Sequence, residues 1–265
     1  MKYGESSFDI LYLLFAIISG VVILLRAKAF AGDAKGRARN VGAWLENETG
    51  PAGNVGAQIE NEPGRAEGAN VRAGNRTAML MGLAALILGF GDAFHLVPRV
   101  LNYFTGYDMT CALGVGKLVT SVTMTVFYVL MYYIWTSAFA GEKDRKTEAA
   151  VWCLAIVRVA LCLFPQNDWI HNGNSMTWGI LRNVPFVVLG AIICWLYFRT
   201  RAENRILRLT WIFILLSFLF YIPVAVGAGA VPILGMLMLP KTICYILVIA
   251  SFLKWTSSSE KALVK

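Results

Sequence analysis

The chain has 265 residues, of which 57% are hydrophobic and 15% are charged, and its formal net charge is +8. Soluble domains carry about 25% charged residues, so this composition excludes an ordinary soluble protein and indicates an integral membrane protein. Eighteen of the 24 Lys and Arg residues lie in alternate connections between apolar segments and in the C-terminal tail. This distribution is a signal of membrane topology, and we expect no nucleic-acid partner.

Several segments are long and apolar enough to cross a bilayer. A helix needs about 20 apolar residues to span a hydrocarbon core of about 30 Å. The predicted spans are 9–25, 78–104, 118–139, 149–164, 177–198, 209–231 and 232–253. Only the sequence GAGAVP divides the last two spans. We therefore predict an all-α fold, a single polytopic membrane bundle (1–265) of seven transmembrane helices.

The first span is predicted to be a permanent helix and not a cleaved signal peptide. Its leader, MKYGESSFD, has one Lys and two acidic residues, and no A-x-A-type cleavage site directly follows the apolar run. Because cytoplasmic loops collect Lys and Arg, we expect the N-terminus outside and the C-terminus inside a plasma (cytoplasmic) membrane.

The connection 27–77 differs from the rest of the chain in composition. It is rich in Gly, Ala, Asn, Glu and Arg, and it repeats itself, since NVGAWLENETG at 40–50 returns as NVGAQIENEPG at 54–64. With few large apolar residues it cannot bury enough surface to offset its ordering entropy. We expect a low-complexity, disordered cytoplasmic loop; a partner-binding arm is the alternative.

The second span ends in ionisable residues. The sequence FGDAFHLVPR contains Asp92 and His95, one turn apart on the same helical face, and Arg99 a further turn outward. Ionisable side chains inside a membrane are rare and costly, and by default they face the bundle interior or a wet cavity. This stretch predicts a polar cavity in the outer half of the membrane.

Residues from other spans are predicted to lie at a similar depth. At a rise of about 1.5 Å per residue, Arg158 lies just beyond the middle of the fourth span and Lys241 close to the middle of the seventh. The other polar candidates are Arg182 and Asn183 of the fifth span, Ser217 and Tyr221 of the sixth, and the stripe Ser121, Thr125, Tyr128 and Tyr132 of the third.

Structural roles are open for several of these residues. Asp92 could hold helices together by pairing with a buried cation, and His95, which has no metal-ligand company, could pack by a hydrogen bond. Arg99 could extend to the outer surface, whereas Arg158 and Lys241 are too deep to do so. Three buried basic residues against one buried acid predict a positively biased cavity. A small anionic or zwitterionic ligand, or a lipid headgroup, would supply the missing negative charge.

An internal repeat is a further hypothesis. When Pro98 of the second span is aligned with Pro223 of the sixth, Lys117 and Lys241 follow them by 19 and 18 residues. The equivalent spans run in the same direction, so the bundle would be a 3+1+3 parallel repeat. Transporters are often built from such repeats, with the ligand site at the repeat interface.

The outer connection 163–178 and the cysteines carry weaker signals. The connection is dense in amides and contains Asp168 and His171, and it is either a lid on the cavity or a plain interfacial loop. No C-x-x-C pair occurs among the five cysteines. We therefore expect no disulfide framework, no metal site and no cofactor.

Three classes of function compete. The preferred one is binding or transport of a small anionic or zwitterionic solute. The second is an intramembrane enzyme acting on a lipid, but zinc hydrolases of the alkaline ceramidase and adiponectin-receptor type use several His residues, and this chain has only His95 and His171. No nucleophile with an adjacent base is apparent either, and whether the protein is an enzyme stays open.

The third class is a retinal-type photoreceptor, prompted by Lys241 in the last span. Rhodopsin-like proteins supply a carboxylate counterion from the third span, but 118–139 contains no acid. Asp92 would have to take that place.

Overall fold

The regular elements of the chain are helices. The computed structural model describes residues 2–48, 63–139, 144–173, 175–227 and 231–264, and in these ranges it contains no strand. The long helices are α1 (Lys2–Glu48), α2 (Pro63–Thr105), α3 (Thr110–Ala138), α4 (Arg145–Leu163), α5 (Met176–Arg199), α6 (Thr210–Gly227) and α7 (Met238–Val264). Two short 3₁₀ helices, η2 (Pro165–Asn167) and η3 (Pro232–Leu237), precede α5 and α7. The all-α prediction is confirmed, and the sixth and seventh spans are separate helices.

Most of the helices are apolar over a membrane-spanning length. Large apolar side chains such as Leu11, Ile18 and Leu219 stay exposed on them, as suits a surface that faces lipid. Within the described residues, six spans meet the length and hydropathy that a bilayer requires: Gly4–Ala29, Arg72–Thr105, Thr110–Ala138, Met176–Arg199, Thr210–Gly227 and Ile233–Ser259. The chain is therefore a multi-pass integral membrane protein.

The remaining long helix, α4, is not among these six spans and carries several charges. Four of its 19 residues are charged, among them Arg158. It begins at Asp144, whose carboxylate accepts hydrogen bonds from the backbone N–H groups of Lys146 (3.1 Å) and Thr147 (3.3 Å), as an N-cap does. The hydroxyl of Thr147 also donates to this carboxylate at 2.8 Å, and these hydrogen bonds lower the pKa of Asp144.

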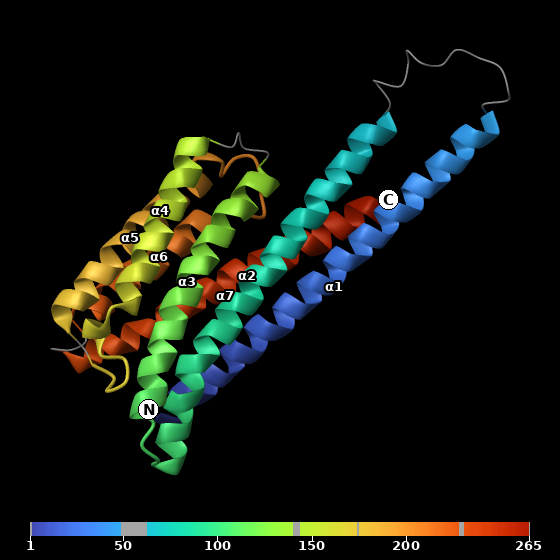
Figure 1. Ribbon diagram of the computed structural model, residues 1–265. Helices are drawn as coiled ribbons and strands as arrows, with labels where there is room; N and C mark the ends of the chain where they lie inside the picture. Colours follow the sequence, from blue (N-terminus) through green and yellow to red (C-terminus); the bar gives the residue numbers. More distant parts are fainter. Residues whose placement is uncertain (1, 49–62, 140–143, 174, 228–230, 265) are drawn as a thin grey trace.

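The helices form a closed ring in chain order. Each long helix packs on the next, and α7 closes the ring against α1; α3 also contacts α5, and α7 also contacts α2. Figure 1 shows the N-terminus beside the turn between α2 and α3, and we call this the N-terminal end of the bundle. At the opposite end, α1 and α2 run side by side and project beyond the other helices (Figure 1).

Aromatic residues fix α3, α5 and α6 against one another at the centre. Tyr128 is fully buried, and its ring centroid lies 5.2 Å from that of Phe186 and 5.3 Å from that of Phe218. Such aromatic pairs contribute about 1 kcal/mol each beyond their area burial. Gly190 lets α5 approach α6 closely, because a Cβ at this position would collide with the ring of Phe218.

The ends of the predicted insertion 27–77 are helical, where we expected disorder. α1 continues to Glu48 and α2 begins at Pro63. The Ala, Arg and Glu residues that cannot build a core are nevertheless good helix formers, and extending an existing helix avoids the cost of nucleating a new one. Residues 49–62 lie outside the described part of the chain. Most of the second copy of the repeated sequence NVGAQIENEPG, at 54–64, falls among them.

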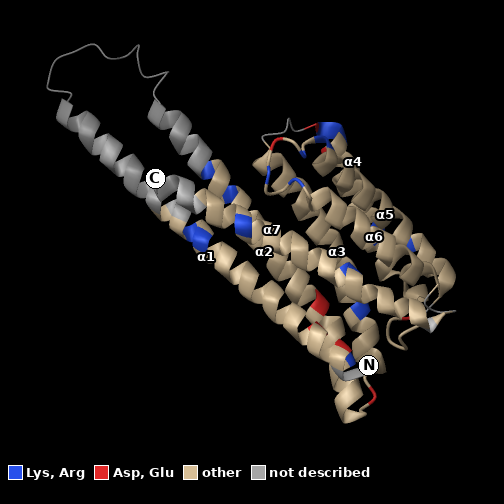
Figure 2. Cartoon of the chain, turned by 180° about the vertical axis from the view of Figure 1, so that it is seen from behind, with Lys and Arg blue, Asp and Glu red and all other residues tan. Residues whose placement is uncertain are grey.

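Charge is unevenly distributed along the bundle. Figure 2 shows Lys and Arg on α1 and α2 toward the end where these helices project, and Asp and Glu on the same two helices near the N-terminal end.

The orientation with the N-terminus outside and the 3+1+3 repeat stay predictions.

Candidate ligand-binding site

Asp92 lies between residues of α1 and α7. The hydroxyl of Tyr12, which is buried, donates a hydrogen bond to Asp92 Oδ2 at 2.7 Å. The carboxylate is also close enough to the Lys241 ammonium, in the first turn of α7, for the two charges to attract each other. The two partners bring α1, α2 and α7 together at this depth.

Lys241 is surrounded by aromatic rings. Its Nζ lies 4.8 Å from the ring centroid of Tyr221 on α6 and 5.5 Å from that of Tyr245 on α7. A cation at this distance from an aromatic face is attracted to it by about 2 kcal/mol or more when it is desolvated. These rings replace part of the hydration that Lys241 loses inside the bundle.

Arg158 on α4 is the most deeply buried charge of the predicted set. Its side chain is 2% exposed, and its Cζ lies 3.3 Å from the ring centroid of Phe186. Tyr221 and Cys162 lie beside the guanidinium. Nε and Nη1 have no hydrogen-bond partner, and no carboxylate among the described residues forms an ion pair with Arg158.

Arg158 and Lys241 lie near enough to repel each other, and both are next to Tyr221. We call these three residues the cationic centre. Lys241 has Asp92 as a neighbouring negative charge, whereas Arg158 has none among the described residues, and a buried cation without a negative partner is costly.

Asn183 and Arg182, adjacent on α5, make different contacts. Asn183 Oδ1 accepts a hydrogen bond from the Tyr221 hydroxyl at 2.6 Å, so it borders the cationic centre. Arg182 Nη1 donates to Asn167 Oδ1 at 2.6 Å, and its Cζ lies 4.6 Å from the Trp169 ring. Arg182 is thereby held against the connection between α4 and α5.

The connection between α4 and α5 is held by hydrogen bonds from its own side chains to backbone carbonyl groups at the end of α4 and just after it. The amide of Asn167, which is buried, donates to the carbonyl oxygen atoms of Leu161 (2.8 Å) and Phe164 (2.9 Å). The indole of Trp169 donates to the carbonyl of Cys162 at 2.7 Å. Asp168 and His171, singled out in the sequence, pair with each other at 2.6 Å and stay exposed.

His95 lies at the edge of this region, on α2. Its Nδ1 is buried and has no hydrogen-bond partner. Lys241 and Lys117 are both within electrostatic range of its ring. Lys117 itself donates to Asn172 Oδ1 at 2.6 Å, so α3 is tied to the same connection that holds Arg182.

Arg99 lies apart from the cationic centre. It forms an ion pair with Glu5 and a longer one, at 4.0 Å, with Asp9, both on α1. Asp9 is 6% exposed, so it is a second buried acid beside Asp92, and the count of one buried acid made from the sequence was too low. The α1 and α2 side of the bundle therefore carries paired charges of both signs.

Of the polar stripe on α3, Tyr128 contacts α6 and α7. Its hydroxyl lies 3.5 Å from those of Ser217 and Tyr245. Ser121 and Thr125 donate instead to backbone carbonyls one turn earlier in α3, and the buried Tyr132 hydroxyl has no hydrogen-bond partner.

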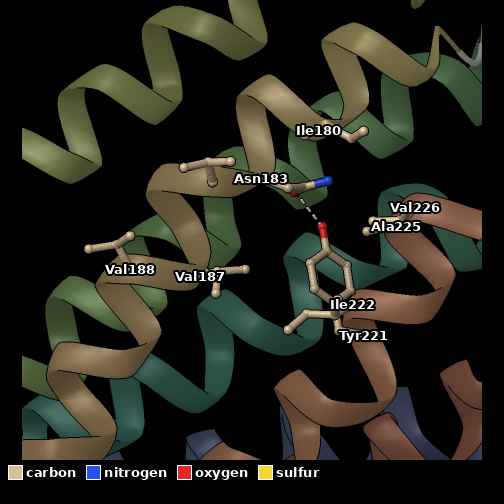
Figure 3. Close-up of a pocket in the computed structure, with 9 residues that line it drawn as sticks. Ile180, Asn183, Val187, Val188, Tyr221, Ile222, Ala225 and Val226 are labelled. Atoms are coloured by element: carbon tan, nitrogen blue, oxygen red, sulfur yellow. Dashed lines mark hydrogen bonds between the residues drawn. The ribbon is translucent and has the colours of Figure 1, made fainter.

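A groove of about 250 Å³ lies between α5 and α6 on the outside of the bundle. Apart from Asn183 and Tyr221 its lining is apolar: Ile180, Val184, Val187, Val188, Ile222, Ala225 and Val226. Figure 3 shows the hydroxyl of Tyr221 directed at Asn183 among these aliphatic side chains. The groove therefore reaches Tyr221 of the cationic centre and Asn183 beside it.

Sequence reasoning overlooked several residues of this region. Tyr12 and Asp9 lie three positions apart in the first span, a spacing that puts both on one face, and this signal could have found them. Nothing in the sequence singles out Phe186 beneath Arg158 or Asn167 beside Arg182.

Comparisons with protein-family models, with curated proteins and with solved structures found no match to this chain. Among the described residues, no group of three or more His, Cys, Asp and Glu side chains could hold a metal ion.

Proposed function

We propose that this protein binds a small anionic or zwitterionic ligand at the cationic centre, and that it serves the binding or the transport of that ligand. The observation that carries the proposal is the Arg158 guanidinium, 2% exposed, with two nitrogen atoms that lack a hydrogen-bond partner. Its positive charge is uncompensated among the described residues.

A purely structural role does not account for this charge. Taking an ion out of water costs several kcal/mol, and an apolar residue of similar volume is often neutral or stabilising by about 1–4 kcal/mol at such a site. Arg158 adds to this cost by repelling Lys241. A ligand that brings a carboxylate, a phosphate or a sulfate would offset both penalties.

The chemistry of the neighbouring groups fits such a ligand. A guanidinium donates charge-assisted hydrogen bonds to carboxylate or phosphate oxygen atoms, and the Lys241 ammonium would attract the same anion. Asp92 lies near Lys241 and would attract the positive end of a zwitterion. In a transporter, Asp92 and His95 are the candidates for carrying a proton with the ligand.

The test is a comparison of thermal stability between wild type and Arg158→Met in one detergent. The panel contains short carboxylates, phosphate monoesters, amino acids and single-chain fatty acids. A ligand present at about 100 times its Kd raises the free energy of unfolding by about 2.7 kcal/mol. We expect at least one compound to stabilise wild type, and none to stabilise Arg158→Met.

Arg145→Met is the matched control, because Arg145 lies on the same helix and is exposed. It should respond to the ligand as wild type does. Without ligand, Arg158→Met should be at least as stable as wild type. A loss of several kcal/mol in Arg158→Met, with no compound shifting wild type, would make Arg158 a structural residue and overturn the proposal.

A further inference from the structure

The connection between α5 and α6, residues 200–209, is built as a fixed surface. Thr200 Oγ1 accepts a hydrogen bond from the Trp135 indole of α3 at 3.0 Å. Asn204 Oδ1 accepts hydrogen bonds from the backbone N–H groups of Ile206 (2.9 Å) and Leu207 (3.2 Å), and the side chain of Leu207 is fully buried. The connection is therefore held to the bundle at its start and near its end.

A groove of about 480 Å³ lies between this connection and the start of α6. Its lining consists of three arginines of the connection, Arg201, Arg205 and Arg208, and of the apolar residues Ala202, Leu209, Trp211 and Ile212. All three arginine side chains belong to exposed residues. The groove thus combines a cationic rim with an apolar wall.

Arg201 is held in place by an aromatic platform. Its Cζ lies 4.0 Å from the ring centroid of Phe198, and its Nη1 donates to the Phe198 carbonyl at 2.7 Å. The Phe198 ring is stacked on Trp195 at 5.9 Å and meets Trp211 edge-on at 4.9 Å. This guanidinium is therefore oriented before any ligand binds.

The three arginines have no acidic partner in the part of the chain that the structure describes. The ion pairs of Arg99 with Glu5 and Asp9, and of His171 with Asp168, involve none of the residues of this groove. Glu203 is the sole acid of the connection, and it does not line the groove. Three cations on one groove attract an anion more strongly than scattered surface charges do.

The groove lies across the boundary between polar and apolar surface. The membrane span of α6 begins at Thr210, so Trp211 and Ile212 belong to the apolar segment, while Arg201 and Arg205 precede it. Phospholipids present the same order, with a phosphate outside and acyl chains within. Guanidinium groups bind phosphate oxygen atoms through several parallel hydrogen bonds.

We propose that this groove binds the headgroup of an anionic phospholipid in the leaflet that the connection between α5 and α6 contacts. The arginines would take the phosphate, and Leu209, Trp211 and Ile212 would contact the glycerol and the upper acyl chains. This site is separate from the cationic centre and does not depend on the function proposed for it.

The experiment measures lipid binding to the purified full chain by native mass spectrometry, from detergent micelles with equal amounts of phosphatidylglycerol and phosphatidylcholine. The groove variant carries Arg201→Gln, Arg205→Gln and Arg208→Gln. The matched control carries Arg145→Gln, Lys146→Gln and Lys254→Gln, which remove the same charge from exposed residues outside the groove.

We expect wild type and the control to prefer phosphatidylglycerol, and the groove variant to lose about tenfold or more of that preference. Equal losses in both variants would show diffuse attraction to surface charge and overturn the proposal, as would no loss in either. Displacement of the lipid by an equal concentration of inorganic phosphate would overturn the assignment to a lipid.

A charge-preserving variant covers the case in which the groove variant does not fold. Replacing Arg201, Arg205 and Arg208 by Lys keeps the net charge but removes the planar donor set. The preference for phosphatidylglycerol should then fall at least about threefold, because point charges do not replace parallel hydrogen bonds. An unchanged preference would show that charge alone suffices and would contradict a fitted site.

Discussion

Two groups of charged residues lie in one bundle, and they differ in whether each charge has a partner. On α1 and α2, Arg99 pairs with Glu5 and Asp9, and Asp92 accepts a hydrogen bond from Tyr12. On α4, Arg158 has neither an acidic partner among the described residues nor a full set of hydrogen bonds. The first group can be explained by the joining of two helices, whereas for the second we propose a bound ligand.

The largest effect is expected from Asp92, which accepts the hydrogen bond from Tyr12 in the first group and also lies near Lys241, the neighbour of Arg158. Asp92→Asn removes the negative charge that Lys241 faces and weakens the hydrogen bond from Tyr12. Breaking a buried pair from one side costs about 3–5 kcal/mol, and because the two charges are not in direct contact we expect about 3 kcal/mol. Unfolding in the detergent used for Arg158→Met measures this difference.

The exposed Asp108 supplies the control for this measurement. Its carboxylate accepts hydrogen bonds from the backbone N–H and the hydroxyl of Thr110, which an Asn side chain can also accept. Asp108→Asn should therefore leave stability nearly unchanged. If Asp92→Asn is tolerated and Arg158→Met is not, the roles of the two groups are reversed.

Much of the fold could be predicted from the sequence, because the hydropathy of a segment of about 20 residues indicates whether that segment can lie in lipid. The helices α2, α3 and α5 lie where the apolar runs predict them, and α4 forms although its charges keep it below the usual hydropathy of a span. The ends of α1 and α2 were underestimated, since hydropathy says nothing about a polar sequence that extends an existing helix.

The depth of a residue is also readable from sequence, but the rotation of one helix against another is not. Counting residues placed Arg158, Lys241 and Tyr221 at similar depth, and the structure brings these three together. The same counting placed Arg99 with them, although it faces α1. Whether Arg99 meets the acids of α1 depends on which face α1 turns toward α2. The sequence of α1, an apolar helix with acids at its start, indicates that face only weakly.

A double-mutant cycle tests the partnered group by itself. The ion pair of Arg99 and Glu5 is partly exposed, with 22% and 27% of the side chains accessible. Such pairs contribute about 1 kcal/mol at most. We expect Glu5→Gln and Arg99→Gln each to cost less than that, with a coupling of about 0.5–1 kcal/mol when the two are combined.

The neighbouring Asp9 sets the control for this cycle. It lies 4.0 Å from Arg99, so the coupling with Glu5 should persist in an Asp9→Asn background. A coupling of zero would mean that Arg99 extends to the membrane surface without a partner. Arg99 would then belong with the uncompensated charges, and the division between the two groups would fail.

The smallest effect is a dependence on pH that comes from the exposed carboxylate at the start of α4. Hydrogen bonds from Thr147 and Lys146 hold the pKa of Asp144, at the start of α4, below its ordinary value of 3.8. A carboxyl whose pKa is lower in the folded state contributes stability above its unfolded pKa, and this contribution is lost as pH falls through the folded pKa. Thermal unfolding of wild type and Asp144→Asn should therefore run parallel from pH 7 to about pH 4 and approach each other only below it. A loss of stability that begins between pH 5 and 7 must then come from groups other than Asp144. If Asp144→Asn removed that loss, the assignment of Asp144 as a carboxylate stabilised by its capping hydrogen bonds would be wrong.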